Sequence, residues 1–485
     1  MKFKKWISAM AATVLAATLT VTPIVNAEET RTIADESIYD VLVDRYYNGT
    51  SANDIDADST DPIKFNGGDF VGLTKQLSQI SKMGFTIISL GSVFPTEKYD
   101  GSLVTSYSGF EPRFGTEEEF ESLVNTINKN KIKTMIDFPL SYVSENHEWA
   151  QDSTKADWVL ETTNGQVRWD LSNEEIQKAL IDAIVQIVST YDVGGIRLTN
   201  LDNADTNFVN EIIGAIKEVN ADIYVISKEE SDADLDATYH NDTFQIFRSI
   251  YKNVDQDSTQ LFKNLEPFMN GDGKPTQIML DHIQSDRFIM DVEAFPPTRA
   301  KLALATTLLL PGLPVMQYGT EIAMNGAAGP ESHQAYHFKT EEELVDFVKN
   351  IQTLRNSSDT LRMGEFTLIE NDNGLLTFMR SSDSEKWIVV INNTGKTQRI
   401  DVSEELVGEG KELQGMLESE LVKVNKEGTF PIVLDREIVE IFQVIDERGI
   451  NIPYLIALGF VYVIFIAFII AIMRKAKRTK SEKSE

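Results

Sequence analysis

The stretch at residues 194–202, GGIRLTNLD, holds residue types that suit the polar end of an active-site strand. Its two glycines permit close backbone approach. In an extended strand, Ile196 and Leu198 point to one face, whereas Arg197 and Thr199 point to the other. An arginine placed there needs a carboxylate partner, and a threonine is a poor nucleophile unless a nearby base activates it. The chemistry of this strand therefore depends on which groups surround Arg197 and Thr199.

Short apolar runs alternate with helical patterns between residues 38 and 356, as in parallel βα units. Strands are expected at 38–44, 86–90, 133–138, 195–199, 223–227, 244–247, 277–281 and 314–318. Helices are expected at 73–83, 117–129, 174–191, 208–219, 298–310 and 341–356. Eight strands predict a (β/α)₈ TIM barrel, whose working residues sit at the carboxyl ends of its strands. The alternative is a doubly wound open sheet, but no GxGxxG motif follows the first strand.

The connection at residues 139–173 is longer than an ordinary βα loop, so a small domain is expected between the barrel segments 28–138 and 174–356. It carries His147, Trp149, Trp158 and Trp169. These side chains could stack on a ligand, or they could form the connection's own small core. The second interpretation is favoured for each residue taken singly.

Residues 357–446 follow a two-residue alternation with intervening turns, which predicts an antiparallel β domain. Strands are expected there at 366–370, 375–380, 387–392, 398–402 and 438–444.

Both ends of the chain carry membrane-targeting signals. Residues 1–27 combine three lysines, an apolar run and a small-residue cleavage pattern, which indicates a cleaved export signal; the alternative is a signal-anchor helix. Residues 452–473 form an apolar run long enough to cross a bilayer, with a buried core helix as the alternative. The basic tail at 474–485 follows directly. The positive-inside rule then predicts a single-pass membrane protein with an extracellular ectodomain and a cytoplasmic tail.

The composition of the chain excludes several classes of ligand and metal site. The formal net charge is −30, and without the signal's three lysines and the tail's net +4 the ectodomain carries −37. Such a surface repels nucleic acid. There are no cysteines, so disulfides and thiolate metal sites are excluded. The five histidines show no zinc-like spacing such as HExxH.

Several motifs together resemble the α-amylase family of glycoside hydrolases over residues 38–444. They are DRY at 44–46, GGDF at 67–70, FGT at 114–116, Asp137, GIRL at 195–198, LD at 280–281, DRF at 286–288, LPGLPV at 310–315 and YGTE at 318–321. The resemblance implies a barrel with a small domain inserted after strand three and a β-sandwich behind it. The long connection and the alternating C-terminal region agree with that plan.

The resemblance also locates the residues that family chemistry requires. The family's nucleophile is an aspartate two residues after the fourth-strand arginine, and this position is Thr199. The acid position aligns with Lys228, and Glu229 is one residue off, which in a strand points to the other face. The third family carboxylate falls at Gln284. Since all three carboxylates are replaced, the resemblance implies a degenerate member without ordinary glycosidase chemistry.

Other residues of this region are candidates for catalysis or ligand binding. Asp137, Arg197 and Asp281 are retained near the site. An alternative hypothesis makes the chain an active α-glucan hydrolase or transglycosylase with relocated carboxylates, drawn from Asp202, Glu229 and Asp286. Under the first hypothesis an α-glucan or a protein partner binds instead, and Tyr142, His147 and Trp149 are candidate sugar contacts. A transporter-subunit role is suggested only by analogy with membrane-tethered relatives.

One loop resembles the family's calcium site. Oxygen donors from asparagine and aspartate with a backbone carbonyl suit Ca²⁺, although Asn48 stands where an aspartate is usual. An ordinary Asx-rich turn is the alternative. The candidate ligands are Asn48, Thr50, Asn53, Asp54, Gly67 and Asp69.

Overall fold

The computed structural model describes residues 31–340, 342–449 and 452–481. The chain divides into two units, Met1–Thr32 and Ile33–Glu485, and the description below concerns the second. The expected export signal at residues 1–27 lies outside the described residues, as does the end of the tail at 482–485.

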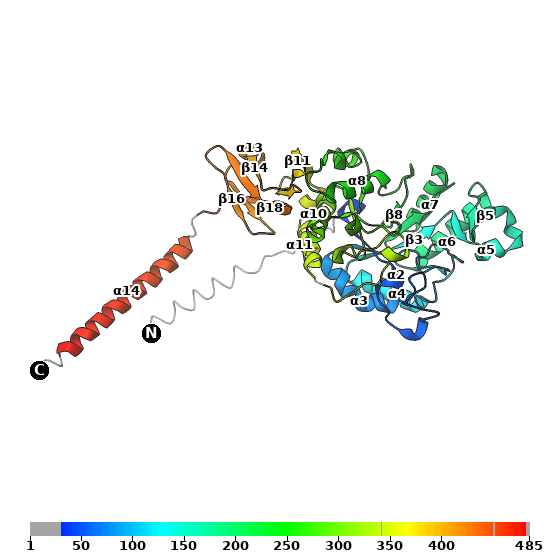
Figure 1. Ribbon diagram of the computed structural model, residues 1–485, viewed down its shortest axis with the longest axis horizontal. Helices are drawn as coiled ribbons and strands as arrows, with labels where there is room; N and C mark the ends of the chain where they lie inside the picture. Colours follow the sequence, from blue (N-terminus) through cyan, green and yellow to red (C-terminus); the bar gives the residue numbers. More distant parts are fainter. Residues whose placement is uncertain (1–30, 341, 450–451, 482–485) are drawn as a thin grey trace, which may run out of the picture. The chain divides into compact units, whose positions relative to one another are not determined.

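A curled, seven-stranded parallel sheet forms the centre of the fold (Figure 1). Its strands lie in the order β8-β7-β3-β2-β1-β10-β9, and each neighbouring pair is parallel. Because these strands are covered on both faces, almost every residue in them is buried. The bounds are β1 Ile38–Asp40, β2 Ile87–Ser89, β3 Lys133–Pro139, β7 Gly195–Thr199, β8 Tyr224–Ser227, β9 Gln277–Ile278 and β10 Leu313–Gln317.

The sixth expected strand is wrong. Residues 244–247 belong to helix α8, Asn241–Tyr251, because Phe244, Phe247 and Tyr251 recur at helical spacing and are all buried. The place beside the edge strands is taken by Thr238, which forms an isolated parallel bridge with Thr276. Just before it, the Asp236 amide donates to the Val225 carbonyl of β8 at 2.8 Å. This short segment therefore hydrogen-bonds toward both edges of the sheet.

Helices surround the sheet, and half of them begin at side-chain caps. Helix α4 begins with a capping box in which Thr116 and Glu119 each satisfy the other's backbone amide. Helix α10 is buried along most of its length, in keeping with its apolar sequence. The bounds are α2 Val43–Tyr46, α3 Phe70–Met83, α4 Glu117–Lys129, α6 Glu174–Thr190, α7 Thr206–Val219, α9 Glu266–Met269, α10 Pro296–Leu309, α11 Glu343–Ser357 and α12 Asp359–Met363.

The long third connection is a small module of its own. A three-stranded antiparallel sheet has the order β4-β6-β5, with β4 Tyr142–Ser144, β5 Val159–Thr163 and β6 Gln166–Trp169. The short helix α5, Glu148–Gln151, lies before β5. Trp169 is completely buried and packs against His147, so the module has its own aromatic core.

The C-terminal region is antiparallel, as its alternation predicts. A six-stranded sheet has the order β11-β12-β13-β18-β15-β16, and β14 pairs with β17 in a second sheet. Three of these strands, β15 to β17, were not expected from the sequence. The bounds are β11 Glu365–Asp372, β12 Leu375–Ser381, β13 Lys386–Asn392, β14 Gln398–Ser403, α13 Glu404–Val407, β15 Lys411–Gly415, β16 Leu421–Lys423, β17 Thr429–Leu434 and β18 Ile438–Asp446.

The chain's last described element is helix α14, Ile452–Ser481. Its section Ile456–Arg474 has a mean hydropathy of 3.0, and this section is long and apolar enough to cross a membrane. Among the described residues it is the single helix with these properties.

Candidate functional site

Four charged side chains meet at the carboxyl ends of four strands. Arg197 of β7 lies directly across from Asp137 of β3 in the parallel register, and its Nε donates to Asp137 Oδ1 at 2.7 Å. Its two terminal nitrogens donate to the carboxylate of Asp40, at the end of β1, at 2.7 and 3.1 Å. Lys228, just after β8, places Nζ 2.8 Å from Asp137 and 4.0 Å from Asp40. We call Asp40, Asp137, Arg197 and Lys228 the charge network.

The network favours the ionised forms of Asp40 and Arg197. Burial raises the pKa of Asp40, but the positive charges of Arg197 and Lys228 outweigh it and leave that pKa below its ordinary value. Burial lowers the pKa of the Arg197 guanidinium, and Asp137 and Asp40 more than compensate, so the net shift is upward. Two buried carboxylates are thereby balanced by two cations. Asp40 was missed in the sequence reading, although a polar residue ending a buried strand is a usable signal.

The three positions at which the resemblance expects catalytic carboxylates line one cavity. A pocket of about 150 Å³ at these strand ends is lined by Thr199, Lys228 and Gln284, which are far apart in the sequence. Asp40 and Asp137 line it as well.

The three candidate substitute carboxylates are placed differently from one another. Glu229 lines the cavity, but its two oxygens accept from the backbone amides of Asn200 at 2.7 Å and Leu201 at 2.5 Å. It thus holds the turn after β7, where Asn200 has a φ of +56°. Asp202 is exposed, and Asp286 is exposed and accepts from the Ala328 amide at 2.5 Å. Neither is among the residues that line the cavity.

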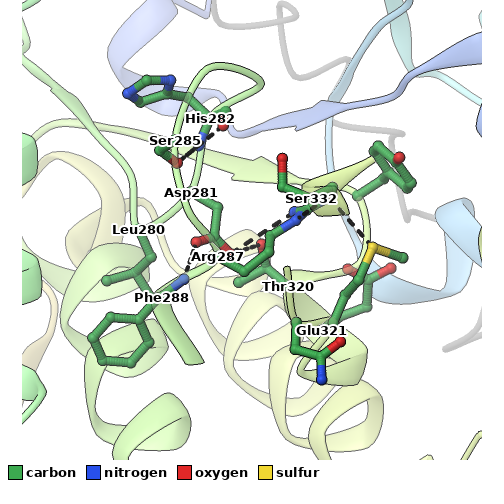
Figure 2. Close-up of polar contacts among 12 residues, drawn as sticks. Leu280, Asp281, His282, Ser285, Arg287, Phe288, Thr320, Glu321 and Ser332 are labelled. Carbon is green, nitrogen blue, oxygen red and sulfur yellow. Dashed lines mark hydrogen bonds and ion pairs between the residues drawn. The ribbon is translucent and has the colours of Figure 1, made fainter. Parts of the chain in front are cut away.

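Asp281 is retained but is fully engaged in the scaffold. Figure 2 shows its carboxylate turned toward Phe288 and Thr320. Oδ1 accepts from the Phe288 amide at 2.6 Å, and Oδ2 accepts from Thr320 Oγ1 at 2.7 Å. Arg248 lies 3.4 Å away as an ion pair, and Arg287 lies 3.9 Å away. Asp281 therefore joins the loop after β9 to the loop after β10.

The candidate sugar contacts lie in the inserted module. His147 is completely buried, and its Nδ1 accepts from the Trp149 amide at 3.1 Å. Burial lowers the pKa of His147 to about 3, so the ring is neutral. Trp149 is half-buried, with its ring centre 5.5 Å from that of Trp158, and Tyr142 is half-buried on β4. His147 and Trp149 thus belong to the module's small core, and neither they nor Tyr142 are among the cavity's lining residues.

The suspected calcium loop brings most of its candidate donors together. Asn48 Nδ2 donates to Asp54 Oδ1 at 2.7 Å, and both side chains lie where a Cβ on Gly67 would collide. Gly67 itself has a φ of +87°. Asn53 Oδ1 is buried without a hydrogen-bond partner among the described residues, while its Nδ2 donates to the Arg113 carbonyl. The unpartnered oxygen of Asn53 is of the donor type that a hard cation prefers.

Other features of the loop have purely structural explanations. Asp69 caps helix α3 through the Gly72 amide and also accepts from the amides of Gly49 and Thr50, at 2.5 to 3.0 Å. Thr50 Oγ1 accepts from the Ala52 amide. Among the residues described, no group of three or more His, Cys, Asp or Glu side chains is placed to hold a metal. Any cation here would therefore rely on amide and carbonyl oxygens beside Asp54.

The parallel sheet with polar strand ends, an inserted module and an antiparallel C-terminal domain define a barrel-type α/β protein of the glycoside hydrolase class. The chain belongs to the α-amylase family. It matches the α-amylase catalytic domain at residues 40–170 and the α-amylase C-terminal domain at 364–442.

Several known proteins resemble this chain over most of its length. An α-amylase from Anoxybacillus is 31% identical with a TM-score of 0.81, covering 87% of this chain and 100% of that one. The α-amylase of Geobacillus thermoleovorans, solved with acarbose, is 29% identical with a TM-score of 0.80, covering 86% and 100%. The β/α-amylase of Paenibacillus polymyxa is 23% identical over 84% of this chain, which spans 38% of that protein's length.

The charge network yields a stability prediction. Replacing Arg197 by Met leaves two buried carboxylates facing only Lys228, and we expect the free energy of unfolding to fall by about 3–5 kcal/mol in urea titrations followed by circular dichroism. Arg197→Lys keeps one charge but loses the fork of donors, so it should fall in between.

The matched control is Arg399→Ala, which removes an exposed ion pair with Asp401 at 2.9 Å. That change should cost less than about 1 kcal/mol. Equal losses for Arg197→Met and Arg399→Ala would contradict a structural role for the network.

Proposed function

We propose that this chain is a non-catalytic member of the α-amylase family whose barrel mouth binds an α-glucan. The observation that carries the proposal is the ion pair between Lys228 and Asp137, 2.8 Å apart in the cavity where family chemistry needs an acid. An ammonium group held there cannot act as the carboxylic acid that protonates a leaving oxygen.

Retaining glycosidases need two carboxyl groups about 5 Å apart, one acting as nucleophile and one as acid. Thr199 and Gln284 supply neither. Four carboxylates line the cavity. Asp40 and Asp137 are committed to Arg197, Glu229 to two backbone amides, and Asp100 to the Ser102 amide. Relocated catalysis would therefore require breaking one or more of these interactions, which is why the hydrolase alternative is less favoured.

A polyhydroxylated ligand suits what remains of the site. Gln317 Oε1 and Ser92 Oγ, from two cavity-lining residues, are buried without a hydrogen-bond partner among the described residues. Buried polar groups left unpaired are costly, so a ligand with several hydroxyls can satisfy them. The Geobacillus relative was solved with acarbose, which supports a sugar over other polar ligands. A protein partner at the same mouth is the alternative occupant.

Activity assays test this proposal. We expect the purified chain to show no turnover of maltohexaose, and Thr199→Asp to stay inactive because Lys228 still occupies the acid position. Calorimetry should nevertheless show binding of maltooligosaccharides.

Asp202→Asn serves as the matched control, since Asp202 is exposed and should affect neither assay. Turnover by the unmodified chain would overturn the proposal. Absence of any binding heat would instead favour a protein partner.

A calcium ion at the loop of residues 48–69 is part of the proposal, because the orphaned Asn53 oxygen and Asp54 are suitable ligands. The ion would cross-link the loop and raise stability by binding only the folded state. We expect CaCl₂ to raise the melting temperature by a few degrees over EDTA, since about 1 kcal/mol corresponds to a shift of roughly 2–4 °C in a large domain.

Asn53→Ala should abolish the calcium-dependent increase, whereas Asn425→Ala, in a turn of the C-terminal domain, should keep it. MgCl₂ in place of CaCl₂ separates a calcium site from a general salt effect. An Asx-rich turn without a cation would show the same melting temperature under all conditions.

Membrane attachment completes the proposal. Export by residues 1–27 followed by insertion of α14 would hold the domain outside the cell, with the basic tail at 474–485 inside. We expect the full chain to sediment with membranes and to resist carbonate extraction, and a chain ending at Glu447 to be released. A protease added to intact cells should digest the domain; protection would reverse the proposed orientation.

A further inference from the structure

A second depression lies away from the barrel mouth, between the barrel and the C-terminal domain. This groove has a volume of about 590 Å³, formed by α10, α11 and the start of β18. It shares none of its lining residues with the cavity at Thr199 and Lys228. Its apolar lining comes from Leu302, Phe347, Leu417, Ile438 and Val439.

An exposed aromatic residue stands at the groove. Phe295 is 63% exposed and precedes two prolines at the start of α10. Its φ of +53° is in the left-handed region, and among the described residues it is the one aromatic side chain with such a backbone. That conformation is strained for a residue with a bulky side chain, and such strain recurs at ligand clamps. Exposing a large apolar ring on a strained backbone favours neither folding nor solubility, so a binding role explains it better.

The polar side of the groove is acidic on balance. Glu343 is paired with Lys301 at 2.5 Å, and Glu437, also at a positive φ, is paired with Arg299 at 2.8 Å. Asp346 has a cation only at 3.9 Å. Glu418, Asn350 and Arg436 complete the polar lining. The negative balance disfavours phosphorylated or nucleic-acid ligands.

We propose that this groove is a second binding site for an α-glucan chain. A glucose unit has apolar C–H faces and hydroxyl-bearing edges, which match Phe295 and Phe347 on one hand and Asp346 and Asn350 on the other. The inference rests on the proposed function, since it assigns the same ligand class to another part of the chain. A basic peptide is the competing occupant, because the carboxylates would also attract it.

Calorimetry of the full chain in detergent, with maltoheptaose as ligand, tests the site. Phe295→Ala should weaken the affinity assigned to the groove by about tenfold, the equivalent of one lost aromatic contact. Phe295→Trp should restore it. Met290→Ala is the matched control. Met290 also precedes α10 in the chain and is 55% exposed, but it is not part of the groove lining. Unchanged unfolding midpoints in urea ensure that the variants are compared as folded proteins.

A barrel-mouth variant, Ser102→Trp, separates the two sites, since Ser102 lines the cavity and a bulky ring there would fill it. If Phe295→Ala binds as the unmodified chain does while Ser102→Trp loses binding, the groove is overturned and the proposed function stands. Loss in Phe295→Ala with full binding in Ser102→Trp supports the groove and overturns the barrel-mouth site. An unmodified chain that binds oligolysine in a Phe295-dependent manner but no maltoheptaose overturns both.

Discussion

The buried guanidinium of Arg197 is the constraint on which the barrel mouth depends. Two charges removed from water cost several kcal/mol each unless every donor finds an acceptor, and Arg197 meets this demand only through Asp40 and Asp137. These residues end three different strands, and Lys228 adds the end of a fourth. The network therefore sets the relative heights of β1, β3, β7 and β8, and the cavity forms above it.

The same network makes the proposed loss of catalysis compatible with an intact scaffold. A glycosidase keeps its carboxyl groups uncommitted, so that one attacks while the other exchanges a proton. Here each carboxylate of the mouth has a charged or amide partner, and Lys228 stands at the position that the resemblance aligns with the family's acid. Charge balance is satisfied and the strand ends stay together. Under the proposed non-catalytic function, these interactions stabilise the ground state and favour no transition state.

Sequence patterns predicted the strands of this network, because β3, β7 and β8 are short, mainly apolar runs between helical patterns. They failed at residues 244–247, where two phenylalanines fit a short strand and a helix face equally well, and only the packing of α8 decides. Strand β17 was missed because Pro431 interrupts its pattern. The backbone role of Glu229 depends on the left-handed conformation of Asn200, which no local pattern encodes.

The C-terminal domain contributes to the groove because it is held in a fixed position against the barrel. Arg299 of α10 is buried and donates to the Asn253 carbonyl, to Asn393 Oδ1 and to Glu437 Oε2, so it joins the barrel to two segments of that domain. Burial lowers the pKa of Arg299, and Glu437 offsets part of that shift. Since Glu437 also lines the groove, the ion pair that fastens the domains holds one groove wall in place. A groove with fixed walls loses little conformational entropy of its own when a ligand binds, which lowers the cost of binding.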